Sequence, residues 1–209
     1  MKTNMKKNVF LLLMTWGTIL PLVAQTHDLT QEELEAFKVQ CQERIDAFQM
    51  GLEIIADKEQ DNEIKQHYIK TLPEMFMGNG EPWVDVSGQK HGAVKMQVAV
   101  IKKNQVVETK SPSLKEYLNG LLGLRWTSVK ITKAKTCLIS NFYKINSNLY
   151  EATATFFQYF EGQSGESYIY KDFTQKEVKV YISRIEDGQL GTYWDMKFGD
   201  INVSEIHKI

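Results

Sequence analysis

The chain has 209 residues, of which 43% are hydrophobic and 24% are charged, and its 25 basic side chains nearly balance 26 acidic ones. This composition is ordinary for a globular protein. Lys and Arg form no basic patch of the kind that a nucleic-acid backbone needs, so the sequence predicts no nucleic-acid partner.

The N-terminus differs from the rest of the chain. Three lysines precede a nearly continuous uncharged apolar stretch, Val9–Val23, and Ala24 supplies a small residue for cleavage. This pattern predicts a signal peptide, residues 1–24, and an exported, periplasmic or secreted, single domain of residues 25–209. An uncleaved anchor is the alternative, although the stretch is short for a membrane span. Cleavage leaves 22 basic and 26 acidic side chains, a net charge of −4.

Two helices are expected first. Thr30 and Glu33 have the spacing of a capping box and predict the start of a long helix of about 26 residues. A second helix is expected from Asp61 until Pro73 interrupts it. Apolar residues recur at intervals of three and four, which predicts one buried stripe on each helix: Leu34, Phe37, Cys41, Ile45, Phe48, Leu52 and Ile55, then Ile64, Tyr68, Leu72, Met75 and Phe76.

Short strands and a third helix are expected next. The turn cluster 78–82 ends the helical region. Alternating residues predict strands at 83–86, 94–100 and 105–109. Ser111-Pro112-Ser113 then predicts a short helix with Pro near its first position, and Gly123 ends it.

The last third of the chain predicts a meander of four long antiparallel strands. Runs rich in Val, Ile, Tyr, Phe and Thr cover residues 129–142, 149–160, 167–182 and 190–203, with turn clusters between them. We find no internal repeat or linker, so one compact domain is expected.

Three phrases carry a resemblance to a known family. Ser113–Leu118, Thr155–Gly162 and Trp194–Ile201 are similar to an NTF2-like module of exported bacterial proteins of unassigned function. The resemblance implies an α+β cone, in which N-terminal helices pack on a strongly curved, mainly antiparallel sheet and leave a pocket. Relatives use the pocket for isomerases, dehydratases or ligand binding, and the outer sheet face for dimers. The fold alone does not choose among these functions.

Asp195 is the candidate catalytic base, with Tyr193 on the same strand face and Tyr181 on the neighbouring strand. Aromatic neighbours that desolvate a carboxylate raise its pKa, as a proton-abstracting base requires. In the alternative, Asp195 lies outside the cone, solvated or paired with Lys197, while Trp194 faces the core.

The strand predicted at 149–160 is aromatic on both faces. Phe156 therefore lies on the face opposite to Phe157 and Tyr159, and one face remains for a partner unless a bulge or hairpin covers it. With Trp194, these three are the candidate binding residues. The sequence thus favours a non-catalytic module that associates through the outer sheet face, as a homodimer or with an exported protein, or holds a small apolar ligand in the cone. An isomerase or lyase in the cone is the alternative.

No cofactor and no metal site are expected. The four histidines are scattered outside known motifs, and Glu63 with His67, one helical turn apart, is read as a solvated contact. Cys41 and Cys137 either pair as a disulfide or stay buried thiols.

Overall fold

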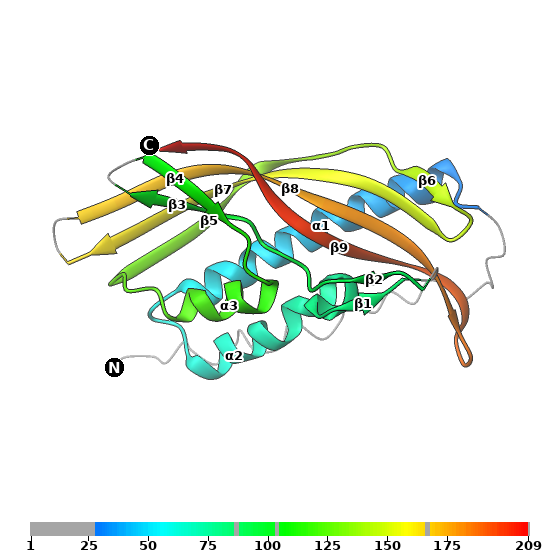
Figure 1. Ribbon diagram of the computed structural model, residues 1–209, viewed down its shortest axis with the longest axis horizontal. Coiled ribbons are helices and arrows are strands. Elements are labelled where there is room, and N and C mark those ends of the chain that lie inside the picture. Colours follow the sequence, from blue (N-terminus) through cyan, green and yellow to red (C-terminus); the bar gives the residue numbers. More distant parts are fainter. Residues whose placement is uncertain (1–27, 86–87, 103–104, 166–167, 209) are drawn as a thin grey trace, which may run out of the picture.

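The structure, a computed structural model, describes residues 28–85, 88–102, 105–165 and 168–208, so the predicted signal peptide lies outside the described part (Figure 1). The helical elements are α1 (Gln31–Ala56), α2 (Asn62–Thr71), the 3₁₀ turns η1 (Leu72–Met75) and η2 (Met77–Gly80), and α3 (Leu114–Leu122). The strands are β1 (Trp83–Val84), β2 (Lys90–His91), β3 (Val98–Lys102), β4 (Gln105–Lys110), β5 (Ser128–Ile139), β6 (Tyr143–Asn146), β7 (Leu149–Ser164), β8 (Tyr168–Asp187) and β9 (Gly191–Lys208).

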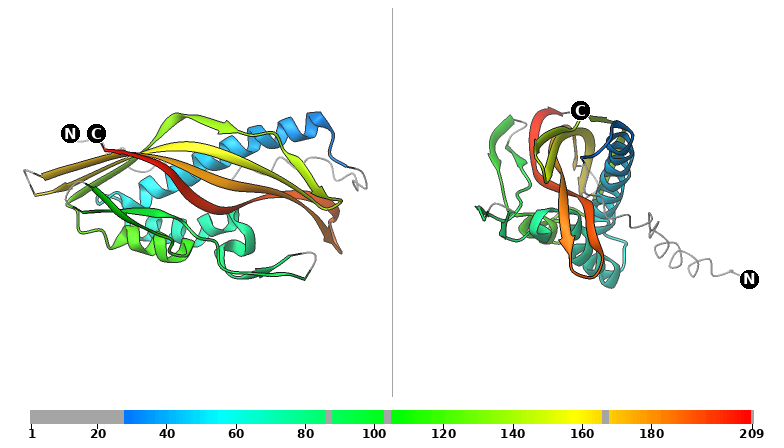
Figure 2. Two further views of the ribbon diagram at one scale, coloured as in Figure 1. Left: turned by 45° about the horizontal axis from the view of Figure 1, so that its top comes forward. Right: turned by 90° about the vertical axis from the view of Figure 1, so that its right-hand side faces the viewer.

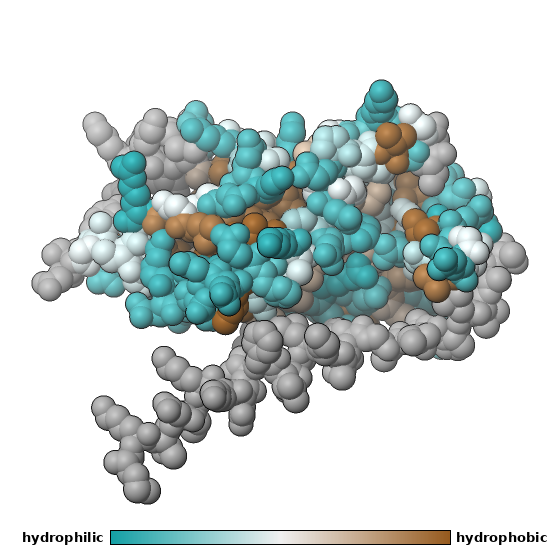
Figure 3. All heavy atoms as spheres, turned by 90° about the horizontal axis from the view of Figure 1, so that it is seen from below, coloured by the Kyte–Doolittle hydropathy of each residue, from teal (hydrophilic) through white to brown (hydrophobic). Residues whose placement is uncertain are grey.

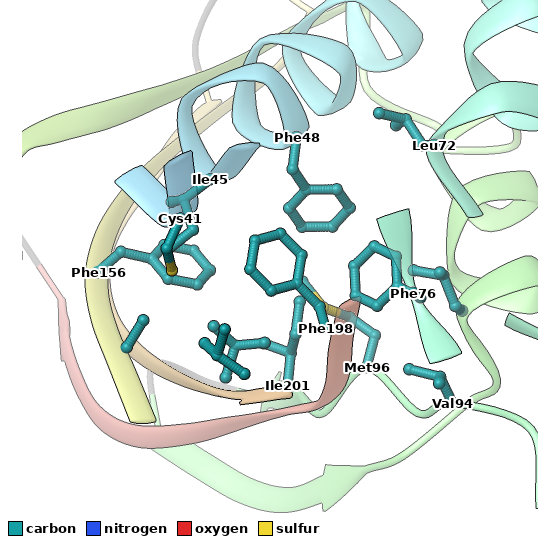
Figure 4. Packing of buried hydrophobic residues seen from close by; sticks show 14 of the residues in the cluster. Cys41, Ile45, Phe48, Leu72, Phe76, Val94, Met96, Phe156, Phe198 and Ile201 are labelled. Atoms are coloured by element: carbon teal, nitrogen blue, oxygen red, sulfur yellow. The ribbon is translucent and has the colours of Figure 1, made fainter. Parts of the chain in front are cut away.

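The capping box predicted for α1 is present. The Thr30 hydroxyl accepts a hydrogen bond from the Glu33 N–H at 3.3 Å, and the Glu33 carboxylate accepts one from the Thr30 N–H at 2.7 Å. These bonds satisfy N–H groups that the first turn leaves without helical partners. Most of the predicted stripe is buried, and Figure 4 shows Cys41, Ile45 and Phe48 pointing from α1 toward the sheet.

The start and the end of the second helix agree with the prediction from the sequence. The Asp61 carboxylate accepts a hydrogen bond from the Glu63 N–H at 2.7 Å and starts α2. Pro73 has no N–H to donate, and the chain continues past α2 as the 3₁₀ turn η1. Gly78 then adopts a φ of 58°, and a Cβ at this position would lie 2.7 Å from the Trp83 Cβ, so glycine lets the chain turn closely here.

The third helix starts at Leu114, two residues after Pro112, which the sequence placed near the first helical position. Ser113 is the N-cap, and its hydroxyl and the Glu116 carboxylate form a second capping box. Pro112 therefore precedes the cap instead of occupying the first helical turn. The helix ends before Gly123, as expected.

The predicted meander is confirmed, with one strand divided. The antiparallel order is β5-β7-β8-β9, and β6 pairs with the same strand β7 that β5 pairs with. The strand predicted over 129–142 ends at Ile139. At the next residue, the Ser140 hydroxyl accepts a hydrogen bond from the Thr153 N–H at 3.0 Å, in place of a backbone carbonyl. The chain then leaves the ladder and Phe142 becomes buried.

The short strands depart most from expectation. Of the strand predicted at 83–86, only the two residues of β1 form a strand. This strand pairs with β2, which the sequence did not indicate. Of predicted strand 94–100, only the end enters the β3–β4 hairpin. The preceding segment runs parallel to the edge of β9 instead: the Gln97 N–H donates to the Ile201 carbonyl at 2.7 Å, and the Ile201 N–H donates to the Lys95 carbonyl at 2.9 Å.

The predicted α+β class is confirmed: a few helices pack on a strongly curved antiparallel sheet, which is the arrangement expected of the cone. Figure 2 shows the long strands curving, with α1 along one face of the sheet and α2 and α3 to one side. The core joins α1, η1, α3 and the inward residues of β7, β8 and β9 in one cluster. Seen from the side of α2 and α3, the surface is mainly hydrophilic, with hydrophobic atoms in limited areas (Figure 3). None of the described helices is both long and apolar enough to cross a membrane.

Replacement of Phe198 tests the importance of this core. Its side chain is 1% exposed, and its ring meets that of Phe76 edge-on at 5.6 Å between centroids. We expect Phe198→Ala to lower the free energy of unfolding by about 3–5 kcal/mol, because a buried aromatic ring is replaced by a cavity. Denaturant unfolding measures this change. Val39→Ala, at a side chain 61% exposed on α1, is the control. Equal losses in the two variants would contradict the assignment.

Candidate functional site

A cavity of about 630 Å³ lies between the inner faces of β7 and β8, α3 and the β3–β4 hairpin. We call it the chamber and define it by residues that line it on each side: Ala99 from β3, Tyr117 and Leu121 from α3, Gln158 from β7, and Asp172 and Lys176 from β8. Its lining also includes exposed Glu116 and Gly120, which mark its opening to solvent. A cavity of this size suits a small organic molecule.

The inner face of β8 changes character along its length. Val178, Val180 and Ile182 are fully buried in the core, as the alternation in the sequence predicts. Thr174 and Lys176 lie on the same face, closer to the start of the strand, and are also buried. Because side chains two residues apart on a strand share a face, one strand supplies both the core and the polar part of the chamber.

Lys176 is the most unusual residue of the chamber. Its side chain is 4% exposed, and its neighbours in register are Phe156 on β7 and Val203 on β9. Within the described part of the chain, its amine makes no hydrogen bond and no ion pair. Burial lowers the pKa of Lys176 to about 8, and the nearby charge of Asp172 opposes this shift. Lysines are rarely buried without a partner, so this position is a functional candidate.

Asp172 is a second ionisable residue that β8 contributes to the chamber, beside Lys176. Burial raises the pKa of its carboxyl group, while the hydrogen bond from the Thr174 hydroxyl, at 2.9 Å, and the charge of Lys176 oppose the increase. Burial also raises the pKa of the Tyr117 phenol across the chamber, and Asp172 adds to that effect. The chamber therefore combines a carboxyl group, a hydroxyl group and an amine in surroundings that disfavour charge.

Gln158 adds a hydrogen-bond donor beside the amine. It is opposite Thr174 in the β7–β8 register, which makes it a diagonal neighbour of Lys176. Its side chain is 6% exposed, and its amide Nε2 has no partner among the described residues. Buried donors are almost always satisfied in folded proteins. Gln158 Nε2 is thus a buried donor without an acceptor among the described residues, at a position diagonal to the Lys176 amine.

Aromatic rings form the apolar wall of the chamber. The Trp126 ring lies 6.2 Å from that of Tyr170 and 6.4 Å from that of Phe160, measured between centroids. A Cβ at Gly162 would lie 2.7 Å from the Trp126 ring, so only glycine lets that ring approach β7 so closely. The wall is aromatic and apolar, as the lining of small-molecule sites usually is.

The predicted catalytic residues lie elsewhere. Asp195 is on the outer side of β9, where its carboxylate oxygens are 3.7 Å from Arg44 Nη2 and 3.8 Å from Lys197 Nζ. Neither Tyr193 nor Tyr181 lines the chamber, and Tyr181 lies opposite Lys197 in register. The geometry favours the alternative stated for Asp195, namely pairing outside the cone.

The predicted binding residues divide between the two faces of the sheet. Phe156 is 1% exposed in the core, and Trp194 meets Tyr150 edge-on at 5.5 Å between centroids. Phe157 and Tyr159 lie on the outer face, where both rings contact Phe173 at 5.2 and 4.7 Å. None of the four predicted residues lines the chamber.

Sequence reasoning missed the chamber residues Gln158, Asp172 and Lys176. A signal existed, because these polar residues occupy the same alternating positions as core residues of β7 and β8. Among the described side chains, no three His, Cys, Asp or Glu gather to hold a metal ion. Cys41 and Cys137 are thiols and not a disulfide, and burial raises the pKa of Cys41 to about 12, with Cys137 adding to the shift.

The burial of Lys176 has a consequence for stability. The folded-state pKa of about 8 lies below the ordinary value of 10.5, so the unfolded chain binds more protons between these two values. The destabilisation is therefore complete below about pH 8 and disappears as the pH rises through 10.5. We expect Lys176→Met to raise the free energy of unfolding at pH 7 by roughly 1–3 kcal/mol, with a gain that shrinks as the pH approaches 10.

Denaturant unfolding at several pH values measures this gain. Glu116 and Tyr117 also face the chamber, and subtracting wild type from variant removes their ionisation from the comparison. The difference still contains the mutual effect of Lys176 and Asp172, because each charge shifts the pKa of the other group. Lys171→Met removes the same charge from a half-exposed side chain on β8 and should show no such gain. A Lys176→Met protein that is less stable than wild type would contradict the assignment.

Neither a family model nor a curated protein sequence matches the chain. Among solved structures, one described as a scytalone dehydratase from Novosphingobium aromaticivorans aligns with a TM-score of 0.43 and 9% identity, over 85% of this chain and 91% of that one. A hexachlorocyclohexane dehydrochlorinase, LinA-type3, from Novosphingobium barchaimii aligns with a TM-score of 0.38 and 11% identity, over 84% and 94%. Similarities this low transfer no activity or substrate, and the description of the fold depends on the chain's own strand order and helix packing.

Proposed function

We propose that the protein is an exported small-molecule-binding protein. Its chamber would take up a molecule with an apolar body and at least one hydrogen-bond-accepting group. The observation that supports this most strongly is Gln158 Nε2, a buried donor without an acceptor among the described residues. It belongs to a diagonal neighbour of Lys176, whose side chain is 4% exposed and makes no hydrogen bond or ion pair with the described residues. A ligand acceptor placed between them would satisfy both, whereas an unpaired buried donor costs about 1–3 kcal/mol.

The shape and lining of the chamber support the same proposal. The cavity of about 630 Å³ has an aromatic wall on one side and a small set of polar groups on the other. This combination is typical of ligand sites, in which apolar contact supplies affinity and few polar groups fix orientation. The export part of the proposal depends on the N-terminal sequence pattern described above.

An isomerase or lyase reaction in the chamber is a second hypothesis. Asp172 and Lys176 share the chamber, and burial shifts the pKa of each toward its uncharged form. Shifts in these directions bring a carboxyl group and an amine closer to the balance of charged and uncharged forms that acid–base catalysis uses. If such a reaction occurs, these two residues are better placed for it than Asp195, which does not line the cavity.

Filling the chamber tests the binding proposal. Ala99 lines the cavity from β3, so Ala99→Phe should obstruct it and weaken binding of an apolar fluorescent dye by about tenfold or more, because the site loses volume. Ala36→Phe, at an exposed position on α1, should bind like wild type. Equal dye affinity in all three proteins would show that the chamber is not the site.

Native mass spectrometry of protein purified from the exported fraction complements the dye. A small mass that leaves on denaturation is expected with wild type and not with Ala99→Phe. The mass of the denatured chain also shows whether residues 1–24 have been removed.

Association through the outer sheet face is a separate hypothesis. Phe157, Tyr159 and Phe173 form an aromatic cluster there, which we call the outer cluster, and Tyr159 is 42% exposed. Exposed clusters of aromatic side chains commonly mark interfaces. A homodimer or an exported partner protein would cover this face without touching the chamber.

A charge in the outer cluster tests this association. We expect wild-type protein to be a dimer and Phe157→Glu to be a monomer, because the new carboxylate would be desolvated at the interface. Analytical ultracentrifugation measures the mass. Gln189→Glu adds the same charge at the exposed β8–β9 turn and should stay dimeric. A wild-type monomer at high concentration would rule out self-association through this cluster.

A further inference from the structure

The charges in the chamber limit what its ligand is. Its lining carries one cationic side chain, Lys176, and two carboxyl groups, Asp172 and Glu116. Glu116 lies at the exposed rim, where its carboxylate accepts a hydrogen bond from the Ser113 N–H at 2.8 Å. The described lining therefore holds no excess of positive charge. Removing a full negative charge of a ligand from water costs free energy, and no further cationic side chain of the described lining would offset this cost.

A neutral acceptor fits the two unpaired donors better. Lys176 and Gln158 both carry N–H groups and both line the cavity, at diagonal positions of the β7–β8 register. A carbonyl oxygen accepts two hydrogen bonds and adds no net charge. The carbonyl carbon of such a ligand would then lie beside the Lys176 amine.

The surroundings of Lys176 also make its amine reactive. It is buried, lines an open cavity and has no ion-pair partner within the described residues. Desolvation of a lysine in an apolar pocket favours the neutral amine, which is the nucleophilic form. The shift of its pKa from 10.5 to about 8 agrees with this geometry. An arginine at this position would keep its charge and could not react in this way.

We propose that Lys176 binds the carbonyl group of a small apolar aldehyde or ketone as a reversible imine. This inference depends on the proposed small-molecule function and specifies its ligand class.

The proposed step is balanced without an oxidant or reductant. The amine lone pair forms a bond to the carbonyl carbon, and the electron pair of the C=O π bond moves to oxygen. Two protons pass from the nitrogen to this oxygen with the help of solvent at the chamber opening. The oxygen then leaves as water as the C=N bond forms, and addition of water reverses the sequence. Asp172 lines the same cavity, and its carboxyl group, with its raised pKa, is placed to exchange a proton with the departing oxygen.

Reductive trapping tests the proposal on the wild-type protein. Purified protein is treated with benzaldehyde and sodium cyanoborohydride near pH 7.5, and peptide mass spectrometry follows the benzyl group on each lysine. At this pH an amine with a pKa of about 8 is roughly one quarter uncharged, against about one part in a thousand for an ordinary lysine. Allowing for restricted access, we expect Lys176 to be labelled at least about tenfold faster than Lys171, which is half-exposed on the same strand.

Competitors of the same size separate the explanations. Benzyl alcohol has the ring without the carbonyl group and should slow labelling at Lys176 but not at Lys171. Lys176→Arg should lose the fast-labelled site, whereas Lys171→Arg, at a half-exposed position of the same strand, should keep it. Both results together would support the imine.

The failures of the two proposals are distinguishable. If the dye binds in the chamber but Lys176 is labelled no faster than Lys171, the imine proposal is wrong and the binding proposal stands. A second outcome also overturns the imine proposal. If benzoate competes with the dye better than benzyl alcohol does, and Lys176 shows no fast labelling, then Lys176 binds an anion. If neither dye binding nor fast labelling occurs, both proposals are wrong.

Discussion

The contact between α1 and the concave face of the sheet supports the rest of the molecule. The stripe of α1 buries Ile45, Phe48 and Leu52 against inward residues of the long strands. A sheet this curved has one apolar face that must be covered, and a single helix covers only part of it. No residue of α1 lines the chamber; α3 and the β3–β4 hairpin enclose that part. The chamber exists because these elements enclose the sheet without filling it.

Strand β8 shows how core and site share one face. Its inward residues are apolar from Val178 onward, where they join the core, and polar at Thr174 and Lys176, where they line the chamber. Burial of an amine without a partner lowers stability, and the adjacent core compensates for it. Positions that break the expected pattern of a strand at such a cost are often functional. The polar half of β8 is best understood in this way.

Strand β7 carries residues of the chamber on one face and residues of the outer cluster on the other. Gln158 points into the chamber, while its neighbours Phe157 and Tyr159 belong to the outer cluster. The alternation of side chains along a strand places these groups on opposite faces of one sheet. Binding in the chamber and association through the outer cluster are therefore physically separate, although one strand carries both. A slip of one residue in the β7–β8 register would exchange the two faces.

The sequence alone determined the start of α1 and the alternation of side chains in the long strands, but not the short strands or the division between β5 and β6. Capping residues Thr30 and Ser113, the helical stripes and the alternation in the long strands depend on neighbours along the chain, so they can be read from it. Tertiary structure decided which alternating polar residues share a cavity. Gln158 and Lys176 are far apart in sequence and become neighbours only through the β7–β8 register, and α3 closes another side of the cavity that they line. Tertiary structure also placed Asp195 beside Arg44, a residue 151 positions away in sequence. Contacts between distant residues depend on packing, which local patterns do not encode.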